Sequence, residues 1–224
     1  MHFFSRPHWT RQIVSRFLYL VPLKALGTAA FMVLFFWAYF GILRSPLFPP
    51  LVMPLTGLDA WIPVTALAFP VYVSLWVYVS LPAALLKEFR PLILFGWWMA
   101  AMCLFSLGIF WLFPTSVPPA GIDWRLYPEM AIIKDVDASG NACPSLHVGA
   151  AVFAAIWLDR IFRAMGVARV WRGLIWLHCL AILWSTVATR QHVVLDVLAG
   201  TVVGALFGGF GLRHAVRSAP SGDI

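Results

Sequence analysis

The chain has 224 residues, of which 62% are hydrophobic and 11% charged, and its formal net charge is +7. A soluble domain of this length would expose more charge, so the composition excludes an ordinary soluble protein and favours an integral membrane protein. The net charge does not indicate a nucleic-acid partner, because the basic residues are dispersed in short loops between apolar runs. The three cysteines lie far apart without a CxxC pattern, which argues against a disulfide framework or a zinc site.

Apolar runs of membrane-spanning length recur along the whole sequence. A helix that crosses a bilayer needs about 20 apolar residues. Helices are expected because lipid cannot hydrogen-bond to an open backbone, and the alternation of a barrel does not occur. We therefore predict an all-α fold, a six-helix transmembrane bundle that forms one domain over residues 1–224. The predicted spans cover about residues 25–43, 64–86, 92–113, 144–162, 171–188 and 191–212.

The loops between these spans give the predicted orientation, because Lys and Arg gather in alternate loops. The side rich in positive charge is predicted to be cytoplasmic, with both termini, in the plasma (inner) membrane. The other side holds the proline-rich stretch 44–63, whose role the sequence leaves open, and the loop 114–143, which is too long for a passive connector. The positive residues on the predicted inner side are Arg6, Arg11, Arg16, Lys24, Lys87, Arg90, Arg160, Arg163, Arg169, Arg172, Arg213 and Arg217.

Polar residues mark the first turns of the fourth and sixth predicted spans, which run in the same direction and so begin on the same outer face. The fourth opens with NACPSLH, ending at His147, where Pro144 suits a first helical turn and the following N–H groups would form an anion site. The sixth opens with TRQHVVLDVLAG, where Thr189 is the expected N-cap. His192 and Asp196 would share one helix face, and a lone carboxylate at this depth needs such a partner.

Two histidines, His147 and His192, would therefore converge beside an anion site, an arrangement that fits phosphoryl transfer. One imidazole would attack phosphorus and form a phosphohistidine, while the other would protonate the leaving oxygen. Backbone N–H groups, Ser145 and Arg190 would stabilise charge on the phosphoryl oxygens.

At these residues the sequence resembles the type 2 phosphatidic acid phosphatase (PAP2) superfamily. CPSLH matches the family's PSxH-type motif, and STVATRQHVVLD matches its SRxxxxxHxxxD motif at Ser185, His192 and Asp196. The resemblance implies a PAP2-like six-helix fold and a reaction that needs no metal or other cofactor. It also implies that His192 is the nucleophile, Asp196 its orienting partner and His147 the proton donor.

Departures from the family pattern indicate a particular branch. The family's arginine falls on Thr186, and KEFRP (87–91) has the RP of the first motif with the wrong lysine spacing, on the predicted inner face. With LFPTSVPP (112–119), these features resemble the inositol-phosphorylceramide synthase-like (inositolphosphotransferase) branch. The cation that would bind phosphate is left open, and the candidates in falling order are Arg190, Arg125 and Lys134.

The predicted function is a membrane-embedded lipid phosphatase or phosphotransferase that acts on a lipid phosphate at the outer face, among membrane lipids and without nucleic acid. One alternative is transfer of a phospho-headgroup onto a lipid hydroxyl. Another is a non-catalytic transporter or lipid-binding protein whose polar residues line a pathway. A third is a metal-dependent hydrolase with His192 and Asp196 as ligands. The alternative roles are an interfacial anchor for Arg190 and solvated loop charges for Arg125 and Lys134. Protein partners are left open.

Glycines recur at every fourth position of the last span, and we expect them to let this helix pack closely against a neighbour. They are Gly200, Gly204 and Gly208.

Overall fold

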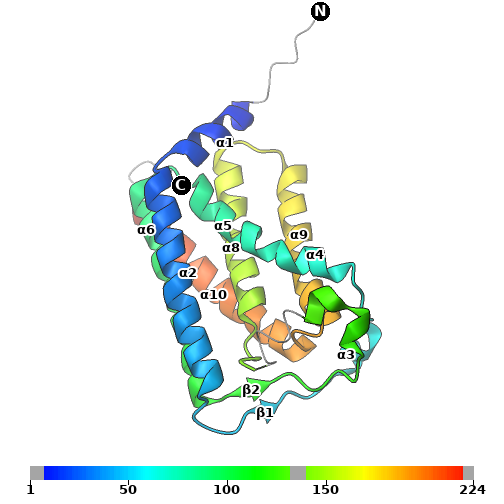
Figure 1. Ribbon diagram of the computed structural model, residues 1–224. Helices are drawn as coiled ribbons and strands as arrows, with labels where there is room; N and C mark the ends of the chain where they lie inside the picture. Colours follow the sequence, from blue (N-terminus) through cyan, green and yellow to red (C-terminus); the bar gives the residue numbers. More distant parts are fainter. Residues whose placement is uncertain (1–7, 132–139, 219–224) are drawn as a thin grey trace, which may run out of the picture.

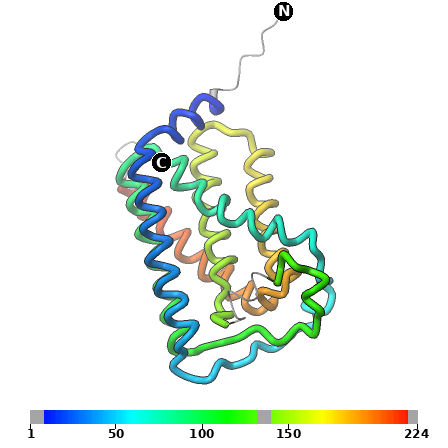
Figure 2. The backbone as a smooth tube through the Cα atoms, viewed as in Figure 1, coloured from blue at the N-terminus to red at the C-terminus, as the bar shows by residue number. Residues whose placement is uncertain are grey.

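The computed structural model describes residues 8–131 and 140–218. Helix accounts for 75% of the residues and strand for 2%, so the fold is all-α as predicted. The long helices form a bundle in which α1 and the end of α10 lie at the same end (Figures 1 and 2). The elements in chain order are α1 (His8–Leu18), α2 (Val21–Arg44), β1 (Leu51–Val52), α3 (Gly57–Trp61), α4 (Ala68–Val73), α5 (Leu75–Leu85), α6 (Phe89–Leu112), β2 (Thr115–Ser116), η1 (Trp124–Leu126), α8 (Leu146–Ala164), α9 (Arg169–Ala188) and α10 (Val194–Ser218).

Among the described residues, five helical segments are long and apolar enough to cross a membrane: α2, α4 together with α5, α6, α9 and α10. They correspond to five of the six predicted spans. The fourth predicted span is also a helix, α8, but it carries Asp159, Arg160 and Arg163 near its end and is not one of the five. The apolar helices support an integral membrane protein, while the count of six spans stays a prediction.

Helix α8 lies in the interior of the bundle, where it contacts α5, α9 and α10 (Figure 1). The side chains of Phe153 and Trp157 are fully buried in the main hydrophobic core. Its charged end is neutralised by ion pairs, because Asp159 accepts from Arg163 at 2.9 Å and from Arg172 at 2.7 Å. Charge in α8 is thus confined to the end of the helix that is farthest from His147.

Close packing between α8 and α10 depends on the glycines of α10. A Cβ atom at Gly200 would overlap the carbonyl oxygen of Ser145, and one at Gly204 would overlap that of Gly149. Gly208 also packs against α8, where a Cβ atom would lie 3.0 Å from the side chain of Ile156 and 3.2 Å from the Cα of Phe153. The predicted close packing of these glycines is therefore confirmed. As a result α8 and α10 run side by side in the same direction, and their first turns share one end of the bundle (Figure 2).

Segments that the sequence left as loops cover this end of the bundle. The proline-rich stretch contributes β1 and α3, and β1 pairs in parallel with β2, so that Leu51 faces Thr115. Figure 1 shows β1, β2 and α3 gathered at the end where α8 and α10 begin. The stretch 44–63 is therefore part of the structure around the candidate site.

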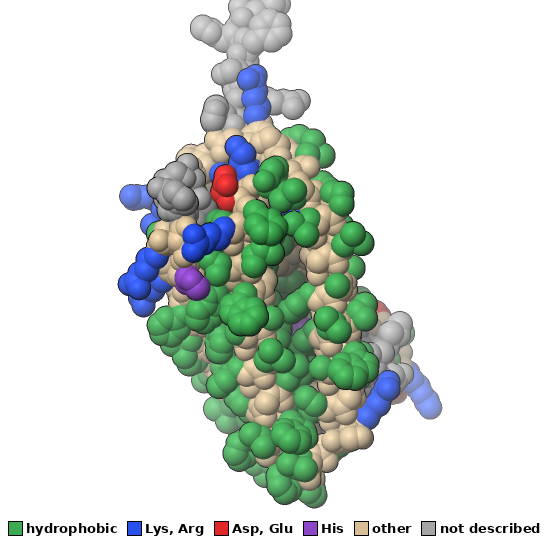
Figure 3. Space-filling model, turned by 90° about the vertical axis from the view of Figure 1, so that its left-hand side faces the viewer, with side chains coloured by type: hydrophobic (Ala, Val, Ile, Leu, Met, Phe, Trp, Pro, Cys, Tyr) green, Lys and Arg blue, Asp and Glu red, His purple; other side chains and the backbone are tan. Residues whose placement is uncertain are grey.

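The flank of the bundle is apolar, as expected for a surface that faces lipid. Large hydrophobic side chains on α2 are strongly exposed, including Leu26 at 71% and Trp37 at 79%. In Figure 3 hydrophobic side chains cover the middle of the visible face, and most of the visible Lys and Arg lie toward the end that carries α1. This distribution agrees with a helical protein embedded in a membrane.

Candidate active site

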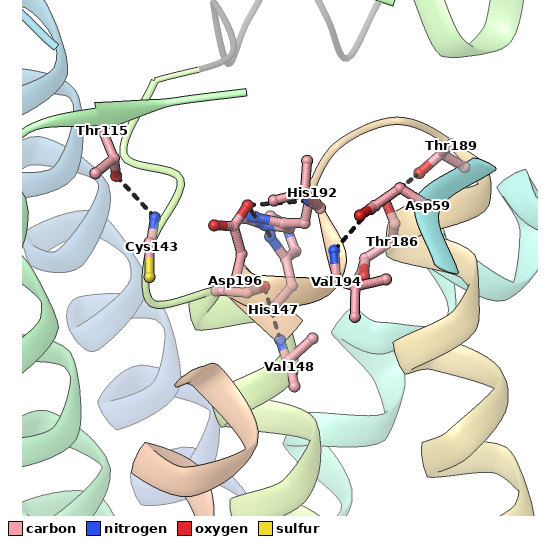
Figure 4. Close-up of polar contacts among 12 residues, drawn as sticks. Asp59, Thr115, Cys143, His147, Val148, Thr186, Thr189, His192, Val194 and Asp196 are labelled. Atoms are coloured by element: carbon pink, nitrogen blue, oxygen red, sulfur yellow. Dashed lines mark hydrogen bonds and ion pairs between the residues drawn. The ribbon is translucent and has the colours of Figure 1, made fainter. Parts of the chain in front are cut away.

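His147 and His192 meet at the end of the bundle where α8 and α10 begin (Figure 4). His147 lies in the first turn of α8, and His192 lies in the loop 189–193 that joins α9 to α10. Nδ1 of His147 is 3.2 Å from Nε2 of His192, which is a hydrogen-bonding distance. Adjacent backbone holds the two segments together, because the N–H of Ser145 donates to the carbonyl of Asp196 at 3.1 Å.

The start of α10 differs from the prediction. The helix begins at Val194, and Thr189 is the C-cap of α9, so the predicted N-cap and the helix face shared by His192 and Asp196 were wrong. The pair still forms, because Oδ2 of Asp196 lies 3.5 Å from Nδ1 of His192 and accepts the N–H of Val193 at 3.0 Å. The 3.5 Å between Asp196 and His192 is longer than a good hydrogen bond, and a small movement of either side chain would bring the two atoms within hydrogen-bonding distance. Asp196 is fully buried.

Tyr72 on α4 completes the arrangement, and sequence reasoning missed it. Its buried hydroxyl lies 2.7 Å from Nε2 of His147, so both ring nitrogens of His147 have a partner. One direction of donation is consistent with all of these contacts, because a carboxylate can only accept. A proton on Nδ1 of His192 faces Asp196, which leaves Nε2 of His192 to accept from His147 and Nε2 of His147 to accept from Tyr72. The unprotonated nitrogen of His192 therefore faces His147.

A family model of the PAP2 superfamily matches residues 63–209, which is well over half of the chain. The chain belongs to the PAP2 superfamily. The matched region includes Tyr72, His147, His192 and Asp196. No curated protein matches the sequence. Membership of the PAP2 superfamily, together with helices apolar enough to cross a membrane, indicates a membrane protein of the phosphatase type.

Thr186 stands at the position where the resemblance places the arginine of the PAP2 motif. It is fully buried, and its hydroxyl donates to the carbonyl of Leu183 at 2.8 Å within α9. Its own carbonyl accepts the N–H groups of Gln191 at 3.0 Å and His192 at 3.1 Å. This residue therefore shapes the turn that presents His192.

Arg190 secures the same loop to the proline-rich stretch. Its guanidinium donates to the carbonyls of Asp59 at 3.0 Å and Ile62 at 3.1 Å, at the end of α3. It does not line the cavity described below, which His147 and His192 do line. In this arrangement Arg190 holds the loop in place, and its contact with phosphate stays a prediction.

Asp59 on α3 binds the first turn of α10 (Figure 4). Its Oδ1 accepts the N–H of Val194 at 2.8 Å, and its Oδ2 accepts both the N–H and the hydroxyl of Thr56 at 2.7 Å each. Burial raises the pKa of Asp59, but these hydrogen bonds and the charge of Arg190 outweigh it, so the pKa lies below its usual value. An ionised carboxylate here is favourable, because it faces the positive end of the helix dipole.

The other predicted site residues occupy different positions. Ser145 is buried as the N-cap of α8, where its hydroxyl accepts the N–H of Val148 at 3.3 Å. Pro144 therefore precedes the helix instead of lying in its first turn as predicted. Arg125 lies in η1 with an exposed side chain and does not line the cavity. Lys134 lies outside the described residues.

Thr115 holds the segment that leads into α8. Its hydroxyl accepts the N–H of Cys143 at 2.9 Å, and its carbonyl accepts that of Ala142 at 3.3 Å (Figure 4). The motif LFPTSVPP therefore does more than end α6, because it fixes the residues just before His147. Burial and the charge of Asp196 raise the pKa of Cys143 to about 11, so its thiol stays protonated at neutral pH and is a poor nucleophile.

A cavity of about 770 Å³ opens beside the two imidazoles. Tyr72, Asn141, His147 and His192 line one end of it, and mainly apolar side chains of α2, α5 and α6 line the rest. This volume lies within the range of roughly 300–1,000 Å³ that is typical of small-molecule sites. The polar groups of the site thus lie at the end of a long apolar space.

Proposed function

We propose that this protein cleaves or transfers the phosphoryl group of a lipid phosphate through a phosphohistidine formed on His192. The observation that carries the proposal is the series of contacts from Tyr72 through His147 and His192 to Asp196, at one end of an apolar cavity. Two imidazoles that can exchange a proton beside a hydrocarbon-lined space suit a substrate with a phosphate head and an apolar tail.

In the first half-reaction, Nε2 of His192 attacks phosphorus and the bond from phosphorus to the lipid oxygen breaks. Protonated His147 gives its Nδ1 proton to that oxygen, so the lipid leaves as an alcohol and the phosphoryl group stays on His192. Asp196 stabilises the positive charge that develops on the His192 ring. The hydroxyl of Tyr72 serves both states of His147, because it donates to a bare Nε2 and accepts from a protonated one.

The substrate phosphate must displace the contact between the two imidazoles. Attack requires about 3–3.5 Å between the nucleophile and phosphorus. The acid must lie about 2.6–3.2 Å from the leaving oxygen. Both cannot fit between nitrogens that are 3.2 Å apart, so we expect the rings to separate when phosphate binds.

In the second half-reaction, an oxygen nucleophile attacks the phosphohistidine, its proton passes to His147 and the bond from nitrogen to phosphorus breaks. Water would release inorganic phosphate, and an alcohol would yield a new phosphate ester. The resemblance of CPSLH and LFPTSVPP to the inositol-phosphorylceramide synthase-like branch favours an alcohol acceptor, such as a lipid hydroxyl. Both products require the same residues.

We place the site at the outer face of the membrane, with both termini in the cytoplasm of a cell whose plasma (inner) membrane holds the protein. Support comes from the positions of the charges. The imidazoles lie where α8 and α10 begin, at the end of the bundle away from α1, while most of the visible Lys and Arg lie toward α1 (Figures 1 and 3). Positively charged ends of membrane helices generally stay inside.

The decisive assay measures the products that purified protein forms from a panel of lipid phosphates, with and without alcohol acceptors. We expect phosphate release or a new ester from the unmodified protein and at least a 1,000-fold loss in His192→Ala, because the nucleophile is gone. Activity that survives in His192→Ala would refute the phosphohistidine. A complete lack of turnover across the panel would favour a lipid-binding protein or transporter.

A strong chelator in the same assay tests the metal-dependent alternative. Within the described ranges, no group of three or more His, Cys, Asp or Glu side chains is placed to hold a metal ion. We expect activity to persist in chelator, and a loss that added divalent metal restores would support the alternative.

A further inference from the structure

The cavity beside the imidazoles continues as a groove along almost the whole of α2. Its lining residues on α2 include Lys24, near α1, and Phe40, near the imidazoles. Sixteen helical steps correspond to about 24 Å, compared with about 30 Å for the whole hydrocarbon core of a bilayer and about 15 Å for one leaflet. The groove is therefore longer than one leaflet is thick.

Helix α2 is most buried near its two ends, and between them the partly buried Phe31 and Phe35 pack against the core. Its buried residues are Lys24 and Tyr39. The ammonium of Lys24 donates to the carbonyl of Ala84 at 2.7 Å, and the carbonyl of Tyr39 accepts from the amide of Asn141 at 3.3 Å. Figure 3 shows the surface of this flank hollowed between ridges of hydrophobic side chains.

Two glycines keep the groove wide. Gly27 on α2 and Gly96 on α6 both line it, and a Cβ atom added at either would meet no atom within 4 Å. Any larger side chain there would extend into the open space. Gly41 on α2 and Gly108 on α6 are equally uncrowded but do not line the groove.

The dimensions of the groove fit one extended chain. The groove is about 24 Å long and has a volume of about 770 Å³. The lining is mainly apolar and leads directly to the imidazoles, which suits the hydrocarbon chain of the substrate. Carbon atoms approach to about 3.5–4.0 Å, so an extended hydrocarbon chain would fit in the groove.

We propose that this groove holds the hydrocarbon chain of a long-chain lipid phosphate, with the phosphate at the imidazoles and the chain extending past the bilayer midplane toward Lys24. The proposal rests on the proposed function of the same site. It adds that the protein selects its substrate by chain length, and that Gly27 sets the room for the far end of the chain.

The test compares docosyl phosphate with octyl phosphate as substrates in detergent. Gly27 lies about 18 Å along α2 from Tyr39, beyond the reach of an octyl chain. We expect Gly27→Leu to lower kcat/KM at least tenfold for docosyl phosphate and less than twofold for octyl phosphate. Gly41→Leu should change neither by more than twofold, and both changes raise helix propensity, so folding should persist.

Binding provides a second readout that does not depend on turnover. In the His192→Ala background, Gly27→Leu and Gly96→Leu should weaken binding of docosyl phosphate at least tenfold, measured by native mass spectrometry, while Gly108→Leu should not. If the protein hydrolyses both esters and Gly27→Leu lowers kcat/KM equally for both, the groove proposal is overturned and the proposed function stands. Binding that depends on Gly27 and Gly96, without turnover by the unmodified protein, would keep the groove and overturn the proposed reaction. If none of these substitutions weakens binding of docosyl phosphate, the groove proposal is overturned.

Discussion

Replacing Asp59 by Asn should loosen the first turn of α10 while nearly preserving the shape of a buried side chain. The carboxylate accepts three hydrogen bonds of 2.7–2.8 Å, from Val194 and from the backbone and hydroxyl of Thr56. An amide has one acceptor oxygen, so at least one donor would face an NH2 group. Hydrogen bonds to charged groups contribute about 1.5–3 kcal/mol, so we expect the free energy of unfolding to fall by about 2–3 kcal/mol.

The same change should slow the reaction, because Val194 follows His192 by two residues. A displacement of about 1 Å in a reacting group can cost about 100-fold in rate. We expect kcat for octyl phosphate to fall about 10- to 100-fold in Asp59→Asn, with KM within twofold. Asp123→Asn is the matched control, because Asp123 is exposed and its carboxylate also accepts a backbone N–H, that of Arg125.

The pH dependence of stability gives a further check on Asp59. Its pKa in the folded protein lies below the ordinary value of 3.8, so its contribution to stability is present above that value and is lost as the pH falls through the folded pKa. In detergent melts, the unmodified protein should therefore lose more stability below about pH 4 than Asp59→Asn does. Equal pH dependence in the two proteins, together with unchanged activity in Asp59→Asn, would refute the positioning role.

Three further changes test other contacts of the site. Tyr72→Phe removes the hydroxyl beside His147 and should lower kcat about tenfold or more with little change in KM, since one hydrogen bond to a charged group is lost; a changed KM alone would contradict this role. Gly204→Ala should lower stability by about 1–3 kcal/mol, because its Cβ would overlap α8. Gly209→Ala on the same helix is the control, because a Cβ there meets nothing within 4 Å. Equal melting temperatures of the two variants would reject the contact. Thr115→Val leaves the N–H of Cys143 without its acceptor and should cost about 1–3 kcal/mol of stability, and an unchanged melt would show the bond to be dispensable.

The sequence predicts the long helices because a lipid environment restricts the backbone conformations that an apolar segment can adopt. Apolar runs near the length of a span have few alternatives to helix, and the structure has a helix at each predicted span. Helix ends are predicted less well, because contacts from elsewhere decide them. Helix α10 begins at Val194 because the carbonyl of Thr186 takes the N–H groups of Gln191 and His192, and the carboxylate of Asp59 takes that of Val194. No local pattern at TRQHV shows these partners.

The residues of the candidate site also divide into those that the sequence predicts and those that it does not. His147, His192 and Asp196 could be proposed because polar residues at the ends of apolar runs are conspicuous and their spacing matches family motifs. Tyr72 could not, because an aromatic residue inside an apolar run looks like any core residue. Asp59 lies in a stretch whose role was left open, although TGLD carries the pattern of a capping box, which the structure contains.

Backbone contacts fix the positions of both imidazoles, which explains how the site can tolerate the loss of the motif arginine. Gly200 brings α10 onto the carbonyl of Ser145, and the N–H of Ser145 binds the carbonyl of Asp196, so the starts of α8 and α10 are joined through main-chain atoms. The N–H of His192 is held in turn by the carbonyl of Thr186. None of these bonds involves the side chain at position 186, whose hydroxyl is satisfied within α9. A threonine there therefore preserves the positions of the two histidines, and the arginine that it replaces would affect the phosphate more than the geometry of the pair.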